Sequence, residues 1–243
     1  MVNIVAHRGF SGEYPENTAL AFLKAVALGV EVIEFDVRMT QDRQLVVIHD
    51  ETLDRTTNGT GPVSDVSLDE IVRLDAGSWF SPNFSRQRVP TLSETLNLIQ
   101  GRARLNVQLK CDESDRAPLT RKVIRQLVDH GALEYAYISS EQETIEFALT
   151  LGTTVQTCNL SPYPTDTYIS RSASIGCRIL QPRNAQVTPE FVKEARLQQM
   201  EVNPFYANDT KEMRRLIACG VDGILTDYPN RLFRVRANAH EDL

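Results

Sequence analysis

The stretch VIEFDVRMTQDRQLVVIHD at residues 32–50 decides the fold. It contains two strand-like runs, residues 32–37 and 45–48, which are joined through residues 39–44. A crossover between parallel strands needs about a dozen residues or more, so this short connection predicts an antiparallel hairpin. The second run is therefore set apart from the parallel strands that the rest of the chain suggests.

Short β-branched runs alternate with amphipathic helical patterns on both sides of this hairpin. Helical patterns lie at residues 18–28, 92–99, 119–128, 141–149, 189–198 and 211–218. Without residues 45–48, eight strand-like runs remain, at residues 3–6, 32–37, 104–110, 135–139, 154–158, 177–181, 200–203 and 222–226. Eight such units close a (β/α)8 barrel. We therefore predict an α/β chain with a single TIM-barrel domain over residues 1–243. An insertion with a short helix near residues 68–74 follows the hairpin strand, at about residues 50–90.

The composition describes an ordinary globular chain and excludes several classes of partner. Of the 243 residues 42% are apolar, which excludes intrinsic disorder. The formal charge of −6 predicts no nucleic-acid partner. No apolar run is long enough to span a membrane, and no signal peptide is recognisable at the N-terminus. The four scattered cysteines predict reduced thiols, so we expect a cytoplasmic protein. None of these features specifies an oligomeric state.

Two carboxylates on the first hairpin strand are the strongest chemical signal. Glu34 and Asp36 are two residues apart and therefore share one face of a strand that is otherwise apolar. Two buried like charges repel each other unless a cation or a shared proton intervenes. A divalent ion with oxygen ligands, Mg²⁺ or Ca²⁺, resolves this conflict. The alternative is a carboxylate pair on a solvated edge strand.

Two histidines are expected to approach this carboxylate pair. Pairing across the hairpin turn sets His49 opposite Phe35, and His7 ends the first predicted strand. The strand-like run at residues 104–110, which follows the insertion, places Asn106, Gln108 and Lys110 on one face. Because polar groups inside a barrel are costly unless they are paired, this arrangement favours a metal and phosphate site at the carboxyl ends of the strands.

At this point the motifs resemble those of the glycerophosphodiester phosphodiesterase family. The segments are HRG at 7–9, PENT at 15–18, EFDV at 34–37, LVVIHD at 45–50, LDRTT at 53–57 and GVDGILTDYP at 220–229. The resemblance implies a TIM-barrel enzyme that uses a divalent metal to hydrolyse glycerophosphodiesters to an alcohol and sn-glycerol 3-phosphate. The expected substrate is therefore a small molecule. It also implies a place in lipid and glycerol metabolism.

The resemblance further implies roles for residues at matching positions. His7 and His49 match the general acid/base pair, and Arg8 matches the residue that neutralises the phosphate. Glu34 and Asp36 match the metal ligands.

Lys110 agrees with the family pattern, whereas Gln108 and Phe205 depart from it. Lys110 matches a lysine near the phosphate. Gln108 stands where the family has a glutamate that binds the metal, so we expect weaker metal binding or an altered balance between Mg²⁺ and Ca²⁺. Phe205 stands where tryptophan is common and still supplies an apolar wall.

Other residues keep two interpretations each. Trp79 and Phe80 line the alcohol side of the pocket or only pack the insertion. Asp227 caps a helix that begins at Pro229 or reaches the site, and the cap is the preferred interpretation. Two other functions stay open beside the main one. The first is lysophospholipase D-like or lyase activity on lysolipids. The second is a phosphodiester-binding barrel whose catalysis is weakened by Gln108.

Overall fold

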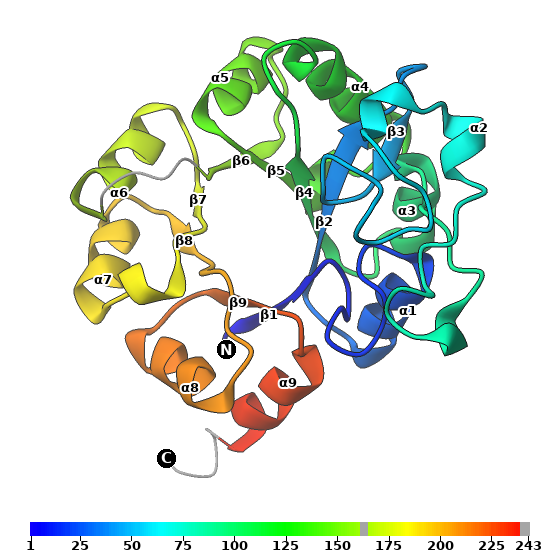
Figure 1. Cartoon of the computed structure of the whole chain (residues 1–243). Helices are drawn as coiled ribbons and strands as arrows, with labels where there is room; N and C mark the ends of the chain where they lie inside the picture. The colour runs from blue at the N-terminus through cyan, green and yellow to red at the C-terminus, as the bar shows by residue number, and fades with distance from the viewer. Residues whose placement is uncertain (161–164, 239–243) are drawn as a thin grey trace.

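A computed structural model describes residues 1–160 and 165–238 and shows a ring of parallel strands (Figure 1). The described strands are β1 Asn3–His7, β2 Val32–Met39, β3 Leu45–Val47, β4 Arg104–Leu109, β5 Ala136–Ser140, β6 Gln156–Asn159, β7 Ile179–Leu180, β8 Glu201–Val202 and β9 Gly223–Thr226. They follow the order β8-β7-β6-β5-β4-β2-β1-β9 around the sheet, with β3 paired to β2 outside this path. Backbone hydrogen bonds from Asp222 to Val202 and from Leu225 to Pro204, both 3.0 Å, close the remaining gap. The predicted TIM barrel is confirmed.

Helices surround the ring and alternate with its strands. They are α1 Ala19–Leu28, α2 Leu68–Ile71, α3 Leu92–Ile99, α4 Arg116–Asp129, α5 Gln142–Thr150, α6 Thr165–Ser174, α7 Pro189–Leu197, α8 Thr210–Cys219 and α9 Pro229–Asn238. Single turns of 3₁₀-helix lie at η1 Val63–Asp65, η2 Pro82–Phe84, η3 Leu133–Tyr135 and η4 Asn184–Gln186. Helix α6 has no counterpart among the predicted helices, because its sequence TDTYISRSAS carries few apolar residues at helical spacing.

The hairpin has the register that the sequence predicts. Strand β3 runs antiparallel to β2 with Val37 opposite Val47 and Met39 opposite Leu45. The Ile48 amide donates to the Asp36 carbonyl at 3.0 Å, which continues this register toward His49. Residues 50–90 then form irregular structure with η1, α2 and η2, next to α1 and α3.

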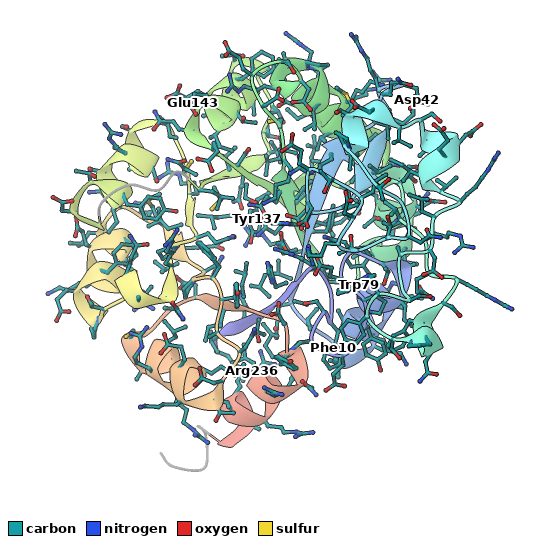
Figure 2. All side chains as sticks on the ribbon, viewed as in Figure 1. Phe10, Asp42, Trp79, Tyr137, Glu143 and Arg236 are labelled. Carbon is teal, nitrogen blue, oxygen red and sulfur yellow. The ribbon has the colours of Figure 1, made fainter. Side chains whose placement is uncertain are left out.

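Alternation along β2 divides its side chains between two environments. Ile33, Phe35 and Val37 are fully buried in the large apolar core between strands and helices. Val32 instead packs inside the ring with Tyr137, which Figure 2 labels near the middle of the barrel. Because successive side chains of a strand point to opposite faces, Glu34 and Asp36 share the inner face with Val32. The amino-terminal end of the barrel interior is therefore apolar at Val32, and the two carboxylates lie further along β2 toward its carboxyl end.

Among the described residues, no helix combines the length and the apolar character that crossing a bilayer requires.

Candidate active site

Strand register brings the predicted carboxylates together with residues of both neighbouring strands. His7 of β1 lies opposite Glu34, and Gln108 of β4 lies opposite Asp36. The side chains of Glu34 and Asp36 are 1% and 0% exposed, so this pair is not on a solvated edge.

A sharp turn after β1 directs Arg8 onto the carboxylates. Arg8 has φ 57° and Gly9 has φ 82°, both in the left-handed region. A Cβ atom on Gly9 would lie 2.8 Å from the Ala21 carbonyl carbon, so only glycine fits this approach. The turn lets the Arg8 amide donate to Glu34 Oε2 at 2.9 Å, while Arg8 Nε lies 3.5 Å from Asp36 Oδ2.

The two carboxylates differ strongly in their electrostatic surroundings. Burial and the neighbouring Asp36 charge raise the pKa of Glu34 to about 7. Burial alone would also raise the pKa of Asp36, but Lys110 and Arg8 lower it below its ordinary value. Lys110 Nζ lies 3.5 Å from Asp36 Oδ1, and Asn17 donates to Asp36 Oδ2 at 2.9 Å. Asp36 is therefore the ionised member of the pair.

These residues fit a hard divalent cation. Asp36 Oδ1 is fully buried and has no hydrogen-bond partner among the described residues. Within the same residues no three His, Cys, Asp or Glu side chains cluster as a metal site, so the two carboxylates need an oxygen of another kind. Gln108 shares the inner face of β4 with Asn106, lies opposite Asp36 in the strand register, and carries an amide oxygen of the kind that such cations accept.

His7 is held by a carboxylate from the last strand. His7 Nδ1 lies 2.6 Å from Asp227 Oδ1, and Ser11 and Asn208 donate to the same carboxylate at 3.0 and 2.6 Å. Of the two interpretations of Asp227, the preferred cap of the helix at Pro229 is wrong and the side chain reaches the site, because His7 engages its carboxylate. Burial disfavours the charged imidazole, but Asp227 and then Glu34 raise the pKa of His7 above its ordinary value. The Tyr206 ring stacks on His7 with centroids 5.3 Å apart.

His49 has a carboxylate partner of its own. Its Nδ1 lies 2.7 Å from Asp50 Oδ1, and Asp50 is bound in turn by Arg55 of the insertion. The pKa of His49 is lowered by burial and by the cations Arg8 and Lys110. The two imidazoles therefore titrate on opposite sides of the ordinary histidine value.

The predicted aromatic residues lie at the periphery of this site. Trp79, labelled in Figure 2 on the side of the insertion, is 38% exposed and packs edge-on against Phe80. Phe205 is half-buried and packs against the apolar cluster inside the ring. The aromatic ring that contacts an imidazole is the next residue, Tyr206.

Several residues of the site were missing from the prediction, although the sequence held signals for some. Asp227 ends a barrel strand, a position from which TIM barrels recruit catalytic groups. Asp50 directly follows a predicted catalytic histidine, and Arg55 lies in the quoted LDRTT motif. Asn208 and Tyr206 lie in an irregular connection and carry no comparable pattern.

This geometry defines a class of protein. Two histidines, each held by a carboxylate, lie with Arg8 and Lys110 around a buried acidic pair at the carboxyl ends of barrel strands. Such a set suits acid–base hydrolysis of an anionic phosphate ester.

Comparison with known proteins identifies the family. The profile of the Glycerophosphoryl diester phosphodiesterase family matches residues 7–231, and the chain belongs to this family of enzymes. A glycerophosphodiester phosphodiesterase of Caldanaerobacter subterraneus subsp. tengcongensis is 35% identical over 240 residues, which cover 96% of each chain. One of Bacillus altitudinis is 35% identical over 97% of this chain and 98% of its own.

A solved structure agrees with this assignment. A phosphodiesterase of Oleispira antarctica, described in complex with the product sn-glycerol-3-phosphate, superposes with a TM-score of 0.91. It is 27% identical and covers 97% of this chain and 96% of its own.

Proposed function

We propose that the chain hydrolyses glycerophosphodiesters to an alcohol and sn-glycerol 3-phosphate, with a divalent metal and with His7 and His49 as the proton-transfer pair. The observation that carries this proposal is the presence of two carboxylate-bound imidazoles at one barrel mouth, with pKa values shifted in opposite directions. The product named for the Oleispira antarctica neighbour supports the choice of substrate.

Charge neutralisation is assigned to Arg8, Lys110 and the metal. Both cationic side chains lie 3.5 Å from Asp36, at the carboxyl ends of β1 and β4, the strands on either side of β2. Glu34, Asp36 and Gln108 would hold Mg²⁺ or Ca²⁺, which would supply further positive charge to offset the phosphoryl oxygens. Arg8 suits a phosphate because its planar guanidinium donates two parallel hydrogen bonds.

The directions of the two histidine pKa shifts support one order of proton transfer. An ionised carboxylate only accepts hydrogen bonds, so each Nδ1–H donates to its carboxylate and each Nε2 faces the reaction. The lowered pKa keeps His49 neutral near pH 7, and its Nε2 accepts the proton of the attacking hydroxyl. The raised pKa favours the protonated form of His7, whose Nε2 then gives a proton to the departing alcohol.

The cavity beside the site favours a small polar substrate over a lysolipid. A cavity of about 320 Å³ is lined by Gln108 and Lys110 together with charged residues such as Arg38, Glu51 and Asp115. An acyl chain needs an apolar groove, whereas these walls suit the alcohol part of a glycerophosphodiester. We also assign contacts with the alcohol side to Trp79 and an apolar wall to Phe205.

The cellular setting completes the proposal. All four cysteines are free thiols, which is the state that a reducing compartment maintains. We therefore place the enzyme in the cytoplasm and treat residues 1–243 as one catalytic domain.

A coupled assay for sn-glycerol 3-phosphate tests the proposal. The purified protein should release it from glycerophosphoethanolamine or glycerophosphocholine with Mg²⁺, Ca²⁺ or Mn²⁺, and EDTA should stop the release. Release from lysolipids only would favour the lysophospholipase D-like alternative. Absence of release with every metal, together with retained substrate binding, would favour the binding-only alternative.

Gln108→Glu tests the ligand set separately. Adding a negative charge at a metal ligand should tighten metal binding, measured by calorimetry on the EDTA-treated protein. Unchanged affinity would place Gln108 outside the ligand set.

A further inference from the structure

Arg55 lies in a loop of the insertion that is held by buried neighbours. Leu53, Thr56 and Thr57 are 2%, 6% and 7% exposed, and the Thr57 hydroxyl donates to the Leu53 carbonyl at 2.7 Å. The Arg55 side chain is 43% exposed, and its guanidinium carbon lies over the face of the Trp79 ring, 5.9 Å from the centroid. The loop therefore presents one guanidinium at a fixed place beside the barrel mouth.

This guanidinium makes four hydrogen bonds to two carboxylates. Nε and Nη2 donate to the two oxygens of Asp50 at 2.6 and 2.9 Å. Nη1 and Nη2 donate to the two oxygens of Glu16 at 2.9 and 2.8 Å. Paired contacts of this kind fix orientation, which a flexible ammonium does not do.

Each of these carboxylates also holds a reacting group. Asp50 Oδ1 lies 2.7 Å from His49 Nδ1, while Glu16 Oε1 accepts from Arg8 Nη1 at 2.7 Å. One carboxylate therefore connects Arg55 to His49, the histidine assigned to accept a proton, and another connects it to Arg8, the arginine assigned to the phosphate.

We propose that Arg55 is a positioning residue that locks His49 and Arg8 into one geometry through Asp50 and Glu16, and keeps His49 a proton acceptor by offsetting the charge of Asp50. This inference rests on the proposed function, because it concerns the same two reacting groups.

Four charged side chains from different elements act on the His49 imidazole. Asp36 of β2 and Asp50 favour the protonated imidazole, whereas Arg8 and Lys110 disfavour it. Arg55 stands behind Asp50, and its hydrogen bonds hold the pKa of that carboxyl well below its usual range. Without Arg55 the Asp50 charge would act on His49 alone, which favours the protonated ring.

A purely structural role is a poor explanation for this arrangement. Ion pairs with solvent-exposed members contribute little to stability, and Arg55 is the most exposed member of its network. Replacement of Arg55 should therefore alter catalysis much more than the melting temperature.

The test compares Arg55→Gln, Arg55→Lys and the exposed insertion variant Arg73→Gln as a matched control. We expect Arg55→Gln to lower kcat/KM by roughly 10–100-fold, as misplacement of reacting groups does. The acidic limb of its pH profile should move to higher pH. Arg55→Lys keeps the charge but loses the paired contacts, so it should lower kcat/KM without moving that limb. Arg73→Gln should match the unmodified enzyme.

Direct titration of His49 by NMR provides a readout that does not need turnover. Its pKa should rise in Arg55→Gln, and this rise should disappear when Asp50→Asn is added, because the uncompensated charge is then absent. An unmoved His49 titration and acidic limb in Arg55→Gln would overturn the inference, whether or not activity or melting temperature falls. The unmodified enzyme in the same assays tests the proposed function independently.

Discussion

The two histidine sites at the barrel mouth make the same kind of contact with a carboxylate, but the pKa values of their imidazoles are shifted in opposite directions. His7 and His49 bind their carboxylates through Nδ1 at 2.6 and 2.7 Å. Neutral groups, Asn208 and Ser11, complete the shell of Asp227, whereas the cation Arg55 binds Asp50. The pKa is raised for His7 and lowered for His49. Burial with the cations Arg8 and Lys110 lowers the pKa of His49, whereas Asp227 and Glu34 raise the pKa of His7.

The two sites also differ in how the chain builds them. His7 and Asp227 lie at the ends of adjacent barrel strands, β1 and β9, which pair in parallel. His49 and Asp50 follow the short strand β3, and their further support comes from the insertion. Under the proposed function, the insertion therefore supports the proton acceptor His49 in addition to covering one side of the barrel.

Removal of either imidazole gives the largest expected effect. His7→Ala and His49→Ala should each lower kcat by about 10²–10⁴-fold, which is the usual contribution of a general acid or base. His130→Ala is the matched control, since that ring contacts Ser93 and Asn97 away from the site. Steady-state assays with melting curves check this result. Full activity in either site variant would remove that histidine from the reaction.

Neutralising the two carboxylates should separate the sites. Asp227→Asn removes the charge that favours protonated His7, so the basic limb should move to lower pH and the active range should narrow. Asp50→Asn removes a charge that favours protonated His49, so the acidic limb should move to lower pH. Both variants should lose roughly 100-fold in rate because each ring loses its orienting partner. The pH–rate profiles of the two variants provide the measurement. Movement of the same limb in both variants would contradict the assignment of His7 as proton donor and His49 as proton acceptor.

Much of the barrel was predictable because it rests on local patterns. The hairpin follows from a connection too short for a crossover, and the strands follow from β-branched runs. Helix α6 was not predicted because its polar sequence TDTYISRSAS lacks a clear amphipathic pattern. The helix forms in the context of the barrel repeat.

The site was predictable only where strand periodicity or register positions a residue. Glu34, Asp36 and Gln108 follow from alternation and pairing along β2 and β4. Asp227 was misassigned because a carboxylate before a helix equally suits a cap, and only its 2.6 Å contact with His7 decides between the two. Arg55 reaches the site through an irregular loop, whose course no periodic pattern specifies.

The unmodified enzyme should show a bell-shaped dependence of kcat/KM on pH that brackets the ordinary histidine pKa. Activity requires neutral His49, so the acidic limb lies below that value because the pKa of His49 is lowered. It also requires protonated His7, so the basic limb lies above that value because its pKa is raised. A narrow optimum with both limbs on one side of the ordinary value would show that the two sites do not differ as proposed.

The Tyr206 ring gives the smallest expected effect and concerns His7 alone. It stacks on that imidazole at an interplanar angle of 17° and is 49% exposed, so it shields one face of the ring from water. A stacked aromatic pair contributes about 0.5–1.5 kcal/mol, so Tyr206→Leu should lower kcat/KM by roughly 2–10-fold. Since burial lowers the pKa of His7, uncovering the ring should also move the basic limb slightly to higher pH and leave the acidic limb in place. Tyr206→Phe keeps the stacked ring and is the control, with the profile of the unmodified enzyme. Movement of the acidic limb instead would mean that Tyr206 acts on His49, and that the two sites are coupled through this loop.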